Sequence, residues 1–311
     1  MFETILVPLD GSDLAAGALE PAAEISRLVG GRIHLVRVPD LPVHAILDQL
    51  PGDIARETDA ARTAAEASLA DAARQLADKG LSVTTSIQEG PPAHGIAKAV
   101  EETGAGLVVL TSHGRGAVAR AWLGSTADRL IRTLDVPMLL LRKGEWRKPK
   151  RILIGLDGSE RAEEILAPAV ELAKVWKSGL LLVHVVPAPS PKTTGEAGTW
   201  LQHQSLVAHR YLHAMALKYR AQGFDVHAQV PVRWDPAQVL QELAETDDVE
   251  LLALATRGLG GADRLLLGSV ADKVIRGSGL PTLILRPRSE GSSTSRAFRD
   301  AAVTPPRGDE P

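Results

Sequence analysis

The chain repeats itself once on the scale of a whole domain, and this repeat constrains its fold more than any other feature. Residues 5–12, ILVPLDGS, match residues 152–159, ILIGLDGS. Residues 124–142 match residues 268–286 in the same way. Matches this far apart mark a complete folding unit rather than the short unit of a solenoid. The sequence therefore predicts two similar domains in tandem.

Each half alternates short apolar runs with longer segments whose apolar residues recur every three or four positions. The first runs cover Thr4–Leu9 and Arg151–Leu156, and each precedes a predicted helix. Such alternation is typical of a parallel sheet with helices on both faces. We therefore predict two doubly wound α/β domains of Rossmann-like fold, each with a five-stranded parallel sheet, over residues 1–145 and 150–287.

A proline lies at the same place inside the first predicted helix of each half. These helices cover about Asp13–Val29 and Glu160–Trp176, and the prolines are Pro21 and Pro168. A proline within a helix removes a hydrogen bond and costs about 3 kcal/mol. We expect a kink or a tightened first segment at both places.

Composition limits the partners of the chain. Its net charge of -3 disfavours nucleic acid as the main partner. The absence of a long apolar run and of a signal-peptide pattern disfavours the membrane and predicts a cytoplasmic protein. Because the chain has no cysteine, it has no disulfide and no thiolate chemistry. Residues 288–311, rich in Pro, Ser, Arg and acidic residues, are expected to form a disordered tail.

Few residues suggest metal binding or catalysis. His209 and His213 lie four positions apart on a predicted helix, a spacing that can hold a metal ion. The first half has no equivalent pair, so we favour a solvated helix face. We predict no metal site and no catalytic residue.

A strand, a glycine turn and a helix start recur near the end of each half. Gly114 and Gly258 follow the fourth apolar run, and the pairs Gly124-Ser125 and Gly268-Ser269 come next. Glycines let a ligand approach the backbone, and free N–H groups at a helix start attract anions. We expect both serines to be helix N-caps. The pattern is typical of a phosphate-binding turn, although glycine turns of this kind also commonly precede helices that bind no ligand.

Ligands of open parallel sheets bind beyond the carboxyl ends of the strands, where the strand order reverses. If the first and fourth strands are neighbours, the turn after each meets the other at this edge. Asp10-Gly11-Ser12 is the turn after the first strand. The sequence thus predicts a carboxylate and a phosphate-binding turn at one site.

These motifs together resemble the universal stress protein family over about residues 1–142 and again over 151–286. The family motif is Gly, two residues, Gly, nine residues, then Gly followed by Ser or Thr. Thr111 and Ala255 replace its first glycine. We favour a strand position there, where Thr111 narrows the pocket without closing it. The resemblance implies a fold that binds ATP and often pairs through its last strand.

The resemblance also implies the residues of each nucleotide site. Asp10 and Asp157 match the aspartate that contacts the adenosine part, with a turn or cap role as the alternative. Val38 and Val185 match the position whose backbone reads adenine. The candidate binding residues are Pro8, Leu9, Asp10, Val38, Thr111, Gly114, Arg115, Gly124, Ser125 and Thr126 in the first half, and Gly155, Leu156, Asp157, Val185, Ala255, Gly258, Gly268, Ser269 and Val270 in the second.

Three functions agree with these residues. We favour a cytoplasmic stress-response protein that binds ATP, with or without Mg²⁺, in a regulatory and largely non-catalytic role. Thr111 and Ala255 favour an interaction module of the same fold that has lost its ligand. A slow ATP hydrolase is the third function, for which the sequence offers no evident general base. We also expect a protein partner of unknown identity and pairing of the two halves through their apolar last strands, an edge that would also allow a homodimer.

Overall fold

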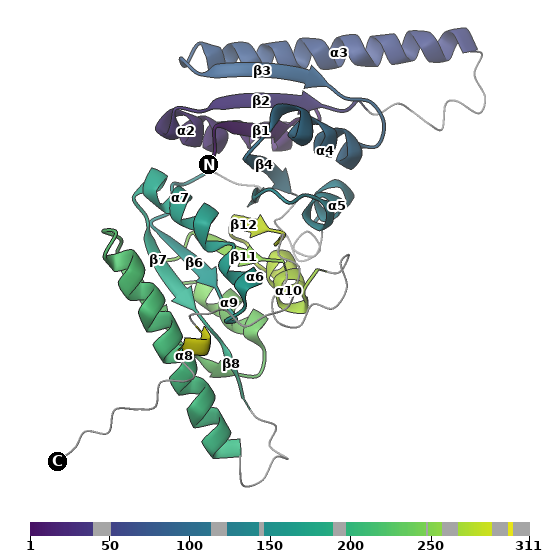
Figure 1. Ribbon diagram of the computed structural model, residues 1–311. Helices are drawn as coiled ribbons and strands as arrows, with labels where there is room; N and C mark the ends of the chain where they lie inside the picture. The colour runs from purple at the N-terminus through teal and green to yellow at the C-terminus, as the bar shows by residue number, and fades with distance from the viewer. Residues whose placement is uncertain are drawn as a thin grey trace, which may run out of the picture. The chain divides into compact units, whose positions relative to one another are not determined.

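The structure is a computed structural model of the chain, which divides into two compact units, residues 1–146 and 147–311. Figure 1 labels most of the helices and strands of both units. Among the described residues, no helix is long and apolar enough to cross a membrane. The described residues are 1–39, 51–112, 123–142, 146–188, 197–246, 248–256, 267–287 and 298–300, with only the backbone described for 51–55 and 197.

The first unit is a parallel sheet flanked by helices. Its described strands are β1 (Thr4–Pro8), β2 (Arg32–Arg37), β3 (Ser82–Ile87), β4 (Leu107–Ser112) and β5 (Met138–Arg142). They lie in the order β3-β2-β1-β4-β5 (Figure 1). The described helices are α1 (Asp13–Ala16), α2 (Leu19–Val29), α3 (Pro51–Ala77), α4 (Pro92–Thr103) and α5 (Ser125–Thr133).

The second unit has the same plan. The strands of its sheet are β6 (Arg151–Gly155), β7 (Gly179–Val183), β9 (Val226–Gln229), β11 (Leu251–Ala255) and β12 (Thr282–Leu285), in the order β12-β11-β6-β7-β9. Two short strands, β8 (Val186–Pro187) and β10 (Val232–Arg233), form a separate parallel pair. The described helices are α6 (Glu160–Glu163), α7 (Leu166–Trp176), α8 (Ala197–Arg220), α9 (Pro236–Ala244) and α10 (Ser269–Gly277).

The predicted doubly wound α/β fold is confirmed in both units. Continuous apolar strands suit a sheet that is covered on both faces, and Ile5, Leu6 and Val7 of β1 are fully buried. Strand β1 pairs with β4, and β6 pairs with β11, both in parallel. The first and fourth strands are therefore neighbours, and the strand order reverses between them.

The first helix of each half is divided as its proline predicts. In the first unit α1 ends at Ala16 and α2 begins at Leu19, which makes Pro21 the third residue of the new helix. In the second unit α6 and α7 divide in the same way, before Pro168. A proline in the first helical turn removes no intrahelical hydrogen bond, because that turn has no backbone acceptor for its N–H groups. The break therefore avoids the cost of a proline inside the helix.

The predicted serine N-caps of the last helices are wrong. Gly124 and Gly268 are the N-caps of α5 and α10, neither helix has a side-chain cap, and each serine is the first helical residue. Asp128, in the first turn of α5, pairs with Arg132 one turn later, at 2.9 Å. Both helices start one residue earlier than their residue types suggest, although Gly124 has a φ of 72° and Gly268 a φ of -60°.

Candidate functional site

The turn after the first strand has the same geometry in both units. In the first unit the Ser12 backbone N–H and hydroxyl donate to Asp10 Oδ1 at 2.8 and 2.6 Å. In the second unit Ser159 donates to Asp157 Oδ1 at 3.0 and 2.6 Å. Each serine also caps the helix that follows, since its Oγ accepts a backbone N–H three residues on. The turn role of both aspartates is confirmed, and their ligand role stays a prediction.

Asp10 remains charged at neutral pH. Burial acts to raise the pKa of its carboxyl group, but hydrogen bonds from Ser12 and the positive charge of Arg37 outweigh burial and hold the pKa below its usual value. A charged carboxylate accepts strong hydrogen bonds from hydroxyl groups. Asp10 is exposed, so its carboxylate is accessible to a ligand at this edge.

The strand ends bring most of the first-unit candidates to one edge of the sheet. Pro8 ends β1 opposite Val36 of β2, and the Leu9 backbone N–H donates to Val36 O at 2.8 Å. Val38 follows the end of β2 directly, half-buried. The Leu9 side chain is only 8% exposed, so Leu9 contributes backbone rather than side chain to this edge.

Thr111 and Ala255 are strand residues, as predicted. Thr111 lies in β4 and Ala255 ends β11. Among the residues that the structure describes, the Thr111 hydroxyl is buried and has no hydrogen-bond partner. It lies 3.8 Å from the position that a Cβ atom on Gly17 would take. The hydroxyl therefore sits under the break between α1 and α2, where an unsatisfied polar atom is costly.

The helix starts differ between the two units. The φ of Gly124 is 72° and no other part of the described chain lies within 4 Å of its ideal Cβ. Gly268 has a φ of -60°, and its N–H donates to Thr256 O at 2.7 Å. Ser125 and Ser269 are exposed and Thr126 is half-buried. As far as the described residues go, the backbone at Gly124 is therefore open to close approach.

The second-unit candidates are more closely packed. Gly155 pairs with Val183, and the Leu156 N–H donates to Val183 O at 2.9 Å. Val185 and Val270 both pack against the apolar core of the unit. Three further predicted residues lie outside the described residues: Gly114, Arg115 and Gly258.

Two residues at this edge were not among the predicted ones. A Cβ atom on Gly11 would lie 2.7 Å from Arg37 Nη2, so the Arg37 guanidinium packs directly on this turn. His184 holds the matching place before Val185. Residues 5–12 match residues 152–159, and the same offset relates Arg37 to His184, so the repeat could have identified these two positions.

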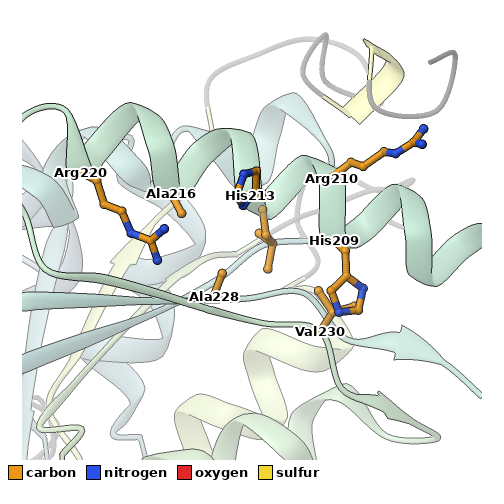
Figure 2. A pocket seen from close by; sticks show the side chains of 8 residues that line it. His209, Arg210, His213, Ala216, Arg220, Ala228 and Val230 are labelled. Atoms are coloured by element: carbon orange, nitrogen blue, oxygen red, sulfur yellow. The ribbon is translucent and has the colours of Figure 1, made fainter. Parts of the chain in front are cut away.

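The two spaced histidines line a groove on α8. His209 and His213 lie on the exposed side of α8, and Figure 2 shows Arg210 extending to a different side of this helix from His209. His209 Nδ1 lies 2.7 Å from Ser205 O of its own helix. In the described part of the chain, no three His, Asp or Glu residues are grouped to hold a metal ion. The groove has a volume of about 410 Å³ and is lined by His209, Arg210, Leu212, His213, Ala216, Arg220, Ala228 and Val230 (Figure 2).

The comparison with known families matches the repeat. The model of the universal stress protein family matches residues 1–142 and again residues 148–286. The chain belongs to the universal stress protein family. It is a tandem member, since each half matches the family separately.

Individual universal stress proteins are similar to this chain at moderate identity. One from Mycolicibacterium smegmatis is 29% identical over 224 residues, covering 67% of this chain and 70% of that protein. The protein YxiE of Bacillus subtilis is 31% identical over 156 residues, covering 46% of this chain and all of that protein. The crystal structure of a universal stress protein from Archaeoglobus fulgidus has a TM-score of 0.71 at 22% identity, covering 91% of this chain and 98% of that one. At this identity, the structural likeness shows the fold.

Proposed function

We propose that this universal stress protein binds ATP or a related adenine nucleotide at the carboxyl edge of its sheet, in a regulatory and largely non-catalytic role in the cytoplasm. The observation that carries the proposal is the neighbouring position of β1 and β4, because the strand order reverses between them. Ligands of open parallel sheets bind at such a reversal. Asp10, Val38, Thr111 and Gly124 all follow or end strands at this edge or begin the next helix.

The first-unit residues suit the parts of an adenine nucleotide. The charged Asp10 carboxylate can accept hydrogen bonds from ribose hydroxyls. The open backbone at Gly124 and the start of α5 can receive phosphate oxygens through backbone N–H groups. The buried Thr111 hydroxyl, which has no partner among the described residues, can bond to a ligand in the pocket. Mg²⁺ would arrive with the nucleotide, held by its phosphates rather than by a protein carboxylate cluster.

Calorimetric titration of Mg²⁺-ATP into the chain, stripped of any bound nucleotide, tests this proposal. We expect binding in the micromolar range, which Gly124→Leu weakens by about 10-fold or more, because a side chain there occupies the phosphate approach. Gly30→Leu is the matched control. Gly30 also has a positive φ, of 67°, and open space around it, but it ends α2 before the amino end of β2, at the opposite edge of the sheet.

Gly30 is in the left-handed helical region, with a ψ of 26°, whereas Gly124 has a ψ of 138° and is strained more by a side chain, so the melting temperature of both variants is measured beside their ATP binding. Selective loss in Gly124→Leu supports the proposal. Absence of heat and of a thermal shift at millimolar ATP would contradict it and turn attention to protein partners. Slow hydrolysis is measured in the same samples, and we expect no turnover beyond a weak background.

A further inference from the structure

The turn that follows the first strand is open in one unit and covered in the other. The sequence Leu-Asp-Gly-Ser and its hydrogen bonds are the same in both. Ser12 is nevertheless exposed, while Ser159 has no exposed surface. A difference of this size between two copies of one turn means that another part of the chain covers the second copy.

The covering group is Phe298, from the segment that follows the second domain. A Cβ atom on Gly158 would lie 2.5 Å from Phe298 Cδ2, so the phenyl ring rests on the backbone of the turn. The ring stacks on His184, with centroids 5.5 Å apart and planes 14° apart. It also meets Tyr211 edge-on, at 5.3 Å and 69°. The sequence predicts a disordered tail here, whereas Phe298 has three defined contacts.

Buried side chains surround the Phe298 ring and form a defined pocket for it. His184 is 8% exposed and Tyr211 is fully buried, with its hydroxyl donating to Glu163 Oε1 at 2.9 Å. Nδ1 of His184 is buried without a hydrogen-bond partner in the described part of the chain. Burial lowers the pKa of His184 to about 4, so the ring that Phe298 stacks on is neutral. Stacked and edge-on rings attract one another beyond the area they bury.

A nearby ion pair adds little to this contact. Arg299 Nη2 lies 3.8 Å from Glu160 Oε1, and both side chains are about half exposed. Exposed pairs of this kind contribute little because water screens them. The aromatic contacts of Phe298 therefore hold the segment.

The Phe298 ring lies against residues that adjoin the proposed adenine position of the second unit. Gly158 follows Asp157, and His184 precedes Val185, the position proposed to read the base. We infer that Phe298 occupies the base position of the second site and excludes the nucleotide, so that ATP loads only the first unit while the segment is bound. This inference rests on the proposed function.

Competition within one chain is strong because the competitor is always nearby. A tethered group acts at an effective concentration on the order of millimolar. If the ring occupies the pocket in nine chains of ten, the apparent affinity of the second site for ATP falls about 10-fold. Removing the ring should therefore raise the affinity of the second site for ATP about 10-fold. The affinity of the first site, in the other unit, should change by less than about 2-fold.

Calorimetry of Mg²⁺-ATP binding to the stripped full chain tests this inference through its stoichiometry. We expect one micromolar site per chain for the unaltered protein, with the second site about 10-fold weaker, and two micromolar sites for Phe298→Ala. Arg299→Ala is the control in the same segment and should still have one. Phe298→Tyr, which keeps an aromatic ring, should also have one.

A background that closes the first site identifies which site is gained. Gly124→Leu alone should bind no ATP with micromolar affinity, and Gly124→Leu combined with Phe298→Ala should bind one. Two micromolar sites in the unaltered chain, or one in both the unaltered chain and Phe298→Ala, would overturn the inference and leave the proposed function standing. If neither the unaltered chain nor any single variant binds ATP, the proposed function fails, and the inference fails with it.

Discussion

Burial of the His184 ring makes the second unit sensitive to acid. The folded protein holds the pKa of His184 at about 4, against 6.5 for an ordinary histidine. Between these values the unfolded chain binds a proton that the folded chain does not, so the contribution is complete above pH 6.5 and is lost as the pH falls toward 4. The loss amounts to about 3 kcal/mol at most. We expect His184→Phe to flatten the fall in melting temperature between about pH 7 and about pH 5.

The control for this measurement is His213→Gln, which replaces an exposed histidine of the same unit. Its melting temperature should follow the same pH curve as the unaltered chain. Equal curves for all three proteins would mean that His184 accepts a proton in the folded state without cost.

Substitution of Thr111 should affect the stability of the first unit and its binding of ATP in opposite directions. Its oxygen is buried with no hydrogen-bond partner in the described chain, so Thr111→Val removes an unsatisfied group and keeps the shape. We expect a gain of about 1 kcal/mol in the free energy of unfolding, measured by urea denaturation. The same variant should bind ATP more weakly if the hydroxyl serves the ligand.

Thr103→Val is the matched control, because the Thr103 hydroxyl donates to Ala99 O at 2.7 Å. This variant should lose stability rather than gain it. Destabilisation in both variants would show that Thr111 has an acceptor in the folded protein.

At the scale of elements, the two short helices α1 and α6 depend on equivalent serine caps in different surroundings. Ser12 Oγ accepts the Ala15 N–H at 3.1 Å, and Ser159 Oγ accepts the Ala162 N–H at 3.0 Å. Loss of an N-cap costs about 1 kcal/mol. Ser159→Ala should cost about 2 kcal/mol, because it removes the cap of α6 and also the hydroxyl that donates to Asp157 in a covered site. Hydrogen exchange of the Ala15 and Ala162 amides measures each helix separately, and equal costs in the two units would contradict the difference in burial.

The regular elements could be predicted because their causes are local. The run Thr4–Leu9 is apolar throughout and β1 ends one residue earlier, at Pro8. The helix breaks follow from the covalent chemistry of Pro21 and Pro168. The serine caps of α5 and α10 were wrong because the glycine before each serine takes the cap position, and residue preference alone does not fix the first residue of a helix.

The candidate site was predictable in position but not in detail. Alternating strands and helices lead directly to the edge where β1 and β4 meet. The difference between the units was not predictable, because it arises from contacts between distant parts of the chain. Phe298 lies in a stretch whose composition is typical of disorder, and its ring finds partners in His184 and Tyr211, which come together only when the chain folds.

At the scale of the whole molecule, each unit has an apolar strand at the end of its sheet, and such an edge is normally paired with another strand. The strand β5 is the last in the sheet of the first unit, and β12 is the last in the sheet of the second. Both are apolar, with Met138 to Leu141 and Thr282 to Leu285 buried. An apolar strand edge left unpaired invites aggregation. We therefore propose that β5 and β12 pair around a pseudo-two-fold axis within one chain, which makes them antiparallel.

Cross-linking tests this pairing cleanly, because the natural chain has no cysteine. Opposed residues of antiparallel strands bring their Cβ atoms to within about 4.5–5.5 Å, near the separation that a disulfide needs. Single cysteines at positions 139, 140 or 141, each combined with one at 283 or 284, should include a pair that oxidises within the chain and shifts its mobility on a non-reducing gel. Leu35→Cys with Leu182→Cys, on the interior strands β2 and β7, should not cross-link. If every end-strand combination stays reduced in folded protein, the two edges are not paired with each other and a second chain is the next candidate to cover them.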